Sequence, residues 1–118
     1  MKDAEVFAAA IEHARLTGTA PPPEETTVVG GVIRREYRIA AGTLLISDTH
    51  DYDHLSILLS GAGVLKRGET IQRLTGPCMV EIKAGVEHAL YAVTDCTWDC
   101  VWSLNLAPAE IKQDAENR

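Results

Sequence analysis

Short runs of β-favouring residues, separated by glycine-containing turns, recur at intervals of about ten residues over most of the chain. This regular alternation of short strands and tight turns is typical of an antiparallel sandwich or barrel. The sequence therefore predicts an all-β fold. The nine expected strands are Thr26–Val29, Val32–Ile39, Thr43–Ser47, His54–Ser60, Gly63–Lys66, Thr70–Leu74, Cys78–Ile82, His88–Val93 and Thr97–Leu104.

A short helix is expected before the first strand. Phe7, Ala10, Ile11 and Ala14 recur at helical spacing between residues 3 and 16, and Gly18 follows as a stop signal. Three consecutive prolines at 21–23 then hold the chain extended. A chain of 118 residues is about one domain. We divide it into residues 1–25, the helix and connector; 26–107, the β-barrel; and 108–118, a polar tail.

Charge and hydropathy exclude two classes of partner. The formal net charge is -6, whereas binding to nucleic acid needs clustered lysines and arginines that neutralise phosphates. No apolar run approaches the roughly 18 residues that span a bilayer, and Asp3, Glu5 and Glu12 interrupt the N-terminal segment where a secretory signal would lie. We expect a soluble cytoplasmic protein that binds neither nucleic acid nor membrane.

Three histidines lie in or beside β-favouring runs, at positions 50, 54 and 88. In an extended run Leu44, Ile46, Asp48 and His50 share one face, but four residues of straight strand would separate His54 from His50 by roughly 13 Å. We therefore expect a turn at residues 51–53 that brings the two imidazoles together. The alternative is a helix, in which residues four apart share a face and can bind one metal ion.

At these residues the sequence resembles the cupin superfamily, whose two motifs are G-x5-H-x-H-x(3,4)-E-x6-G and G-x5-P-x-G-x2-H-x3-N. The chain carries Gly42-x5-Asp48-x-His50-x3-His54-x6-Gly61, and then Gly76 followed by Lys83-x-Gly85-x2-His88-x3-Ala92. Asp48 stands in place of the first histidine of the first motif, and His54 in place of its glutamate. In the second motif, Lys83 stands in place of the proline and Ala92 in place of the asparagine. The resemblance covers roughly residues 30 to 105 and is strongest to small, uncharacterised cupin-like proteins of bacteria and phages. It implies a double-stranded β-helix, or jelly-roll barrel, with a short N-terminal helix.

The resemblance also implies a metal site. It assigns His50, His54 and His88 as ligands of a divalent transition metal, with Asp48 as a fourth ligand or a catalytic base. Imidazole and carboxylate donors suit Fe(II), which we favour, as well as Zn, Mn, Ni or Cu. Ser56 and Leu58 follow His54 at alternate positions and are expected to line the same cavity against a small-molecule substrate.

Two functions remain open from the sequence. One is an Fe(II)-dependent, dioxygenase-like enzyme that acts on a small molecule. The other is a non-catalytic cupin, such as a phage-encoded one, that binds or sequesters a small molecule with a structural metal or none.

The last strand carries an apolar stripe, in which Cys96, Trp98, Cys100 and Trp102 alternate onto one face. Such a stripe is typical of a core or of a dimer interface. We expect a homodimer in which the N-terminal helix and the two tryptophans cover the sheet edges.

Overall fold

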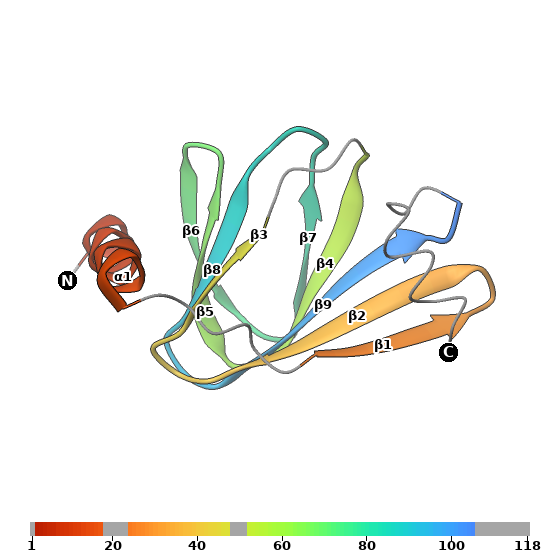
Figure 1. Cartoon of the computed structure of the whole chain (residues 1–118), viewed down its shortest axis with the longest axis horizontal. Helices are drawn as coiled ribbons and strands as arrows, with labels where there is room; N and C mark the ends of the chain where they lie inside the picture. The colour runs from red at the N-terminus through yellow and green to blue at the C-terminus, as the bar shows by residue number, and fades with distance from the viewer. Residues whose placement is uncertain (1, 18–23, 48–51, 106–118) are drawn as a thin grey trace.

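The computed structural model describes residues 2–17, 24–47 and 52–105, which form one helix and nine strands (Figure 1). The helix is α1 (Asp3–Thr17). The strands are β1 (Glu24–Val29), β2 (Val32–Ile39), β3 (Leu44–Ser47), β4 (His54–Ser60), β5 (Ala62–Arg67), β6 (Thr70–Thr75), β7 (Cys78–Ile82), β8 (His88–Ala92) and β9 (Cys96–Ser103).

The strands form two antiparallel sheets that face each other. One has five strands in the order β1-β2-β9-β4-β7, and the other has four in the order β3-β8-β5-β6. Neighbours in each sheet are mostly not consecutive in sequence, so the chain crosses repeatedly between the sheets, as a jelly roll does. The all-β fold with a short N-terminal helix is therefore confirmed.

The main hydrophobic core fills the space between the two sheets. It follows from the alternation along each strand: in β9, Trp98, Cys100 and Trp102 point inward and are buried. The core residues are Ile33, Ile39, Leu58, Leu65, Leu74, Leu90, Ala92, Cys96, Trp98, Cys100 and Trp102. The apolar stripe of the last strand thus belongs to the chain's own core. The expectation that its tryptophans cover sheet edges in a dimer is wrong, because Trp98 and Trp102 are already buried within one chain.

Helix α1 packs on the outer face of the four-stranded sheet (Figure 1). Phe7 is buried there against Leu44 and Val64. Burial of this side chain stabilises the fold by about 2 kcal/mol. At the start of the helix, the Asp3 carboxylate forms an ion pair with Arg73 of β6 at 2.9 Å. The molecule is therefore layered as helix, sheet, sheet. Among the described residues, no helix has the length and apolar character needed to cross a membrane.

The one helix of the described residues does not cover the outer face of the five-stranded sheet. Its β1–β2 side bears charges, among them Arg34 paired with Glu36 at 2.9 Å. Its β4–β7 side is apolar and exposed: Leu55 is 38% exposed and Met79 68%. Among residues 2–17, 24–47 and 52–105, the two sheets therefore differ, because a helix packs on the outer face of the four-stranded sheet and not on that of the five-stranded sheet.

Candidate functional site

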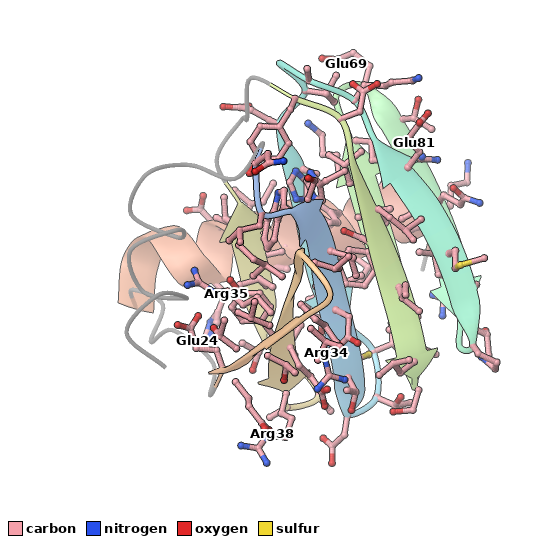
Figure 2. The ribbon with its side chains drawn as sticks, turned by 90° about the vertical axis from the view of Figure 1, so that its right-hand side faces the viewer. Glu24, Arg34, Arg35, Arg38, Glu69 and Glu81 are labelled. Atoms are coloured by element: carbon pink, nitrogen blue, oxygen red, sulfur yellow. The ribbon has the colours of Figure 1, made fainter. Side chains whose placement is uncertain are left out.

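Strand register brings two of the three predicted histidines, His54 and His88, to one end of the barrel, which we call the mouth. His54 begins β4 and pairs with Ile82, the last residue of β7. His88 begins β8 and pairs with Arg67, the last residue of β5. The β5–β6 turn, the end of β7 and the start of β4 lie together at the upper edge of Figure 1, and Figure 2 places the labelled Glu69 and Glu81 at this end.

The two described histidines of the predicted site lie beside each other in the interior of the mouth. Their ring centroids are 5.5 Å apart, with the planes inclined at 55°. His54 is 5% exposed and His88 4%, because both occupy inward positions of their strands. Two imidazoles that ligate one ion at about 2.0–2.1 Å place their centroids about 4.5–5.5 Å apart. The centroid distance of the pair lies at the upper end of this range.

Aromatic rings form one wall of the mouth around His54. The ring of Trp102 lies 5.2 Å from that of His54, inclined at 31°. Tyr52 approaches His54 edge-on, with centroids 6.4 Å apart. Trp102 reaches this position because its neighbour Val101 pairs with Leu55, the residue after His54. The sequence showed the apolar stripe of β9 but not that its last tryptophan faces a histidine.

Asp48 and His50 lie outside the described residues. The predicted alternation of β3 is confirmed for Leu44 and Ile46, which share a face. That face is the outer one, where Leu44 packs on α1, while Leu45 points into the main core. Whether Asp48 and His50 join His54 and His88 therefore stays a prediction from the sequence motif. Within the described ranges, no third histidine, cysteine, aspartate or glutamate joins the two histidines.

The helical alternative for the residues around His54 is wrong. Residues 54–60 form strand β4, paired with β7 on one side and β9 on the other. The β-branched and leucine-rich runs on both sides of the turn favour strand here.

Ser56 and Leu58 lie on the same inward face as His54, but deeper. Both are completely buried. The Ser56 hydroxyl donates a hydrogen bond to the sulfur of Cys100 at 3.6 Å, and Leu58 belongs to the main core. Burial raises the pKa of the Cys100 thiol to about 11, so this layer is an uncharged floor under the histidines.

A polar network links the loop between β7 and β8, which precedes His88, to the residue before His54. The Ala84 N–H donates to Asp53 Oδ1 at 2.8 Å. Lys83 bridges Glu81 at 2.7 Å and Asp53 at 3.8 Å, and its hydrogen bond to Glu81 raises the pKa of its ammonium group. Lys83 stands where the cupin motif has proline. Here side-chain contacts, instead of a proline ring, link the loop to the residue that precedes His54.

Arg67 is a mouth residue that the sequence did not single out. It shares the inward face with His88, its partner across β5 and β8. Its guanidinium donates to the Glu81 carbonyl oxygen and to Gln72 Oε1, each at 3.0 Å. The signal that could have found it is its position two residues after the buried Leu65, on the same strand face.

Solved structures similar to this chain are cupins. A cupin-2 domain-containing protein from Halorhodospira halophila aligns with a TM-score of 0.65 and 14% identity, over 86% of this chain and 80% of that one. An RmlC-like cupin from Desulfovibrio desulfuricans gives 0.62 and 16%, over 70% and 82%. A cupin-2 domain-containing protein from Shewanella frigidimarina gives 0.59 and 14%, over 79% and 91%.

Comparison by sequence gives no such match: no protein-family model and no curated protein matches the chain. The likeness therefore lies in the arrangement of the two sheets, at identities of 14–16% to these three structures. The resemblance that the spacing of the histidines and glycines indicates is thus confirmed at the level of structure: the chain has the cupin fold, and its structural neighbours are proteins of the cupin superfamily.

Proposed function

We propose that the protein binds a divalent transition metal at the mouth and acts there on a small molecule, as an Fe(II)-dependent, dioxygenase-like enzyme. The observation that carries this proposal is the pair of buried imidazoles, His54 and His88, with ring centroids 5.5 Å apart. His50 and Asp48 are the further ligands that the sequence motif supplies.

The donor set fits the proposed metal. Neutral imidazoles and one carboxylate suit Fe(II), Zn, Mn, Ni and Cu alike. Such an ion, with open coordination positions, supplies Lewis-acid or oxygen chemistry when bound. The protein's part is positional: Trp102 packs beside the His54 ring, and the Lys83–Asp53 contacts support the loop before His88. The buried layer of Ser56 and Leu58 excludes water from below.

Metal content measured on untagged protein tests the proposal. We expect about one first-row metal per chain in the wild type and a several-fold loss in His54→Ala and His88→Ala, since each variant removes one ligand. His13→Ala is the matched control, because His13 is an exposed residue of α1 and its loss should leave the content unchanged. Wild-type metal content in both mouth variants would contradict the proposal. Oxygen-consumption screening then separates an oxygenase from other metal-dependent chemistry.

The second candidate is a non-catalytic cupin that binds or sequesters a small molecule. It rests on the same mouth, where the rings of Trp102 and Tyr52 beside His54 could contact a small molecule without a metal ion. Metal-free wild-type protein that still binds small molecules at the mouth would support this function over the first.

We also propose a homodimer, formed through the outer face of the five-stranded sheet. Since Trp98 and Trp102 are core residues, the apolar surface left to cover is the β4–β7 side of the five-stranded sheet, with Leu55, Leu59 and Met79. Light scattering at micromolar concentration should report twice the chain mass, and Met79→Lys should lower it. A monomeric wild type would contradict the dimer.

A further inference from the structure

We infer that Arg67 is an anion-binding residue that selects a small molecule with a carboxylate group at the mouth. The inference uses the site of the proposed function and adds the chemical class of its ligand. It rests on four features of Arg67: its place among the strands, the character of its partners, its free donors and the surroundings of its guanidinium.

The place of Arg67 follows from register. Residues that pair across antiparallel strands have Cα atoms about 4.5–5.5 Å apart and side chains on the same face. Arg67 pairs with His88, so it starts beside one of the two histidines. Its guanidinium then extends past β6 to the backbone of β7, whose last residue Ile82 pairs with His54. Arg67 therefore runs along the mouth from β5, the neighbour of the strand that carries His88, to β7, the neighbour of the strand that carries His54.

The charge of Arg67 is not neutralised within the described part of the chain. Both of its hydrogen-bond acceptors are neutral, one a backbone carbonyl and the other a side-chain amide. The carboxylate of Glu81 lies on the opposite face of β7 from its neighbour Ile82, and it pairs with Lys83 at 2.7 Å. Glu81 thus gives Arg67 a carbonyl oxygen but not a countercharge.

Other described arginines differ in this respect. Arg34, Arg35 and Arg73 each pair with a carboxylate, at 2.9, 3.9 and 2.9 Å. Figure 2 shows Arg35 beside Glu24, and Arg34 and Arg38 toward the end opposite Glu69 and Glu81. Arg38 also lacks an ion pair among the described residues, but it is exposed on the outer face and far from the mouth. Of the arginines whose side chains the structure describes, Arg67 is the one that combines an unneutralised charge with a position beside the histidines.

The guanidinium keeps donors for a ligand. An arginine has five N–H groups in a planar fork, and the two hydrogen bonds use one on each terminal nitrogen. The remaining donors suit the two oxygens of a carboxylate, the anion that a fork binds with two parallel hydrogen bonds. The two existing bonds hold the fork in place, so little rotamer freedom remains to be lost on binding.

The surroundings indicate a ligand with a compact, flat or aliphatic body. Trp102 and Tyr52 form an apolar wall on the His54 side, and the layer beneath is sealed by Ser56 and Leu58. A molecule that places its carboxylate on Arg67 would lay its other end toward the two histidines. Arg67 is thus a specificity-determining residue, while His54 and His88 are the groups that would contact the reacting end.

Matched pairs of small molecules test the inference. The probes are propionate with propionamide and benzoate with benzamide, titrated into the purified full chain and followed by NMR. Each pair differs in charge but hardly in shape. We expect the carboxylates to bind about tenfold more tightly than the amides, the effect of about 1.4 kcal/mol from a charge-assisted pair.

Variants locate the effect. In Arg67→Gln the carboxylate preference should disappear. Arg67→Lys should retain part of it, because a point charge remains but the fork is lost. Arg38→Gln removes the same charge from the opposite end and should bind within twofold of the wild type. A preference that persists in Arg67→Gln, or its absence from the wild type, would overturn the inference. If Arg67→Gln fails to fold, the wild-type ratio and Arg67→Lys still decide.

The metal content of every sample separates this inference from the proposed function. Arg67-dependent carboxylate binding in protein without metal would refute the metal site and leave the inference standing. Metal-loaded protein that binds acids and amides alike would do the reverse. A role limited to tying β5 to β7 would lower the melting temperature of Arg67→Gln without changing the acid-to-amide ratio.

Discussion

The two ends of the barrel interior differ in what their side chains do. At the closed end, around Gly61, Gly76 and Asp95, the chain packs backbone against backbone: the Gly76 N–H donates to the Gly61 carbonyl at 2.8 Å. At the mouth the interior carries imidazoles and a guanidinium. Buried polar groups contribute less to stability than a packed layer, so we expect the closed end to stabilise the fold more than the mouth, where the proposed function lies.

The largest effect is expected at the closed end, from Gly61→Ala. Gly61 has φ +94°, a conformation that L-residues rarely adopt, and an added Cβ would overlap the Asp95 carbonyl oxygen and lie 2.9 Å from the Cys96 sulfur. We expect a loss of about 4 kcal/mol or more in the free energy of unfolding, measured by urea denaturation.

Gly42→Ala is the control for Gly61→Ala. Gly42 also has a positive φ, +84°, but no atom lies within 4 Å of its added Cβ. It should lose only about 1–2 kcal/mol, the cost of the left-handed conformation. Equal losses in the two variants would show that the closed end is not tightly packed.

Leu58→Ala should have the next largest effect. Leu58 is completely buried between the sheets, so its truncation leaves a cavity and should cost about 3 kcal/mol. Leu55→Ala, on the exposed outer face of the same strand, should cost less than about 1 kcal/mol. Denaturation of both variants measures the difference. A loss of small-molecule binding in Leu58→Ala without a loss of stability would instead make Leu58 a lining residue of the site.

The sequence predicted the strands better than it predicted which face of each strand points inward. Every strand of the described chain lies within two residues of its expected position, because glycines and short polar turns mark the ends. In β3, however, Leu44 and Ile46 face outward and Leu45 inward. Since α1 covers that sheet, apolar residues occur on both faces, and alternation alone does not say which is the core.

The proximity of two histidines was predicted where a motif indicated it. The spacing around Gly61 and Gly85 indicated His54 and His88, and the structure places them side by side. Arg67 and Trp102 belong to no motif. Their places depend on which strands become neighbours, through pairs such as Arg67 with His88, and that is a property of the whole topology. No local pattern in the sequence contains it.

A smaller effect on stability is expected at the mouth, from His88→Leu. Leucine has a similar volume and no polar atoms, so the metal-free variant should unfold within about 1 kcal/mol of the metal-free wild type. Added metal should raise the melting temperature of the wild type but not that of the variant, since only the wild type keeps both imidazoles. Thermal denaturation with and without Zn²⁺ measures both. A loss of unfolding free energy as large as that of Leu58→Ala would show that the mouth contributes as much to stability as the packed interior does.

The smallest effect is expected from chemical modification of the cysteines, which tests whether a reagent can reach the buried layers beneath the mouth. Burial raises the pKa of Cys100 to about 11, and burial together with the nearby Asp95 carboxylate raises that of Cys96. Because the thiolate is the reactive form, iodoacetamide at pH 8 should modify the half-buried Cys78 first and leave the other two unmodified in folded protein, as mass spectrometry would show.

The raised pKa also means that the folded state holds the Cys100 proton more tightly than the unfolded chain. Its contribution to stability is complete below the ordinary thiol pKa near 9 and is lost as the pH rises through about 11. Modification of Cys100 as fast as Cys78 would mean that the Ser56 and Leu58 layer is open to solvent, and the division between a sealed interior and a reactive mouth would then be wrong.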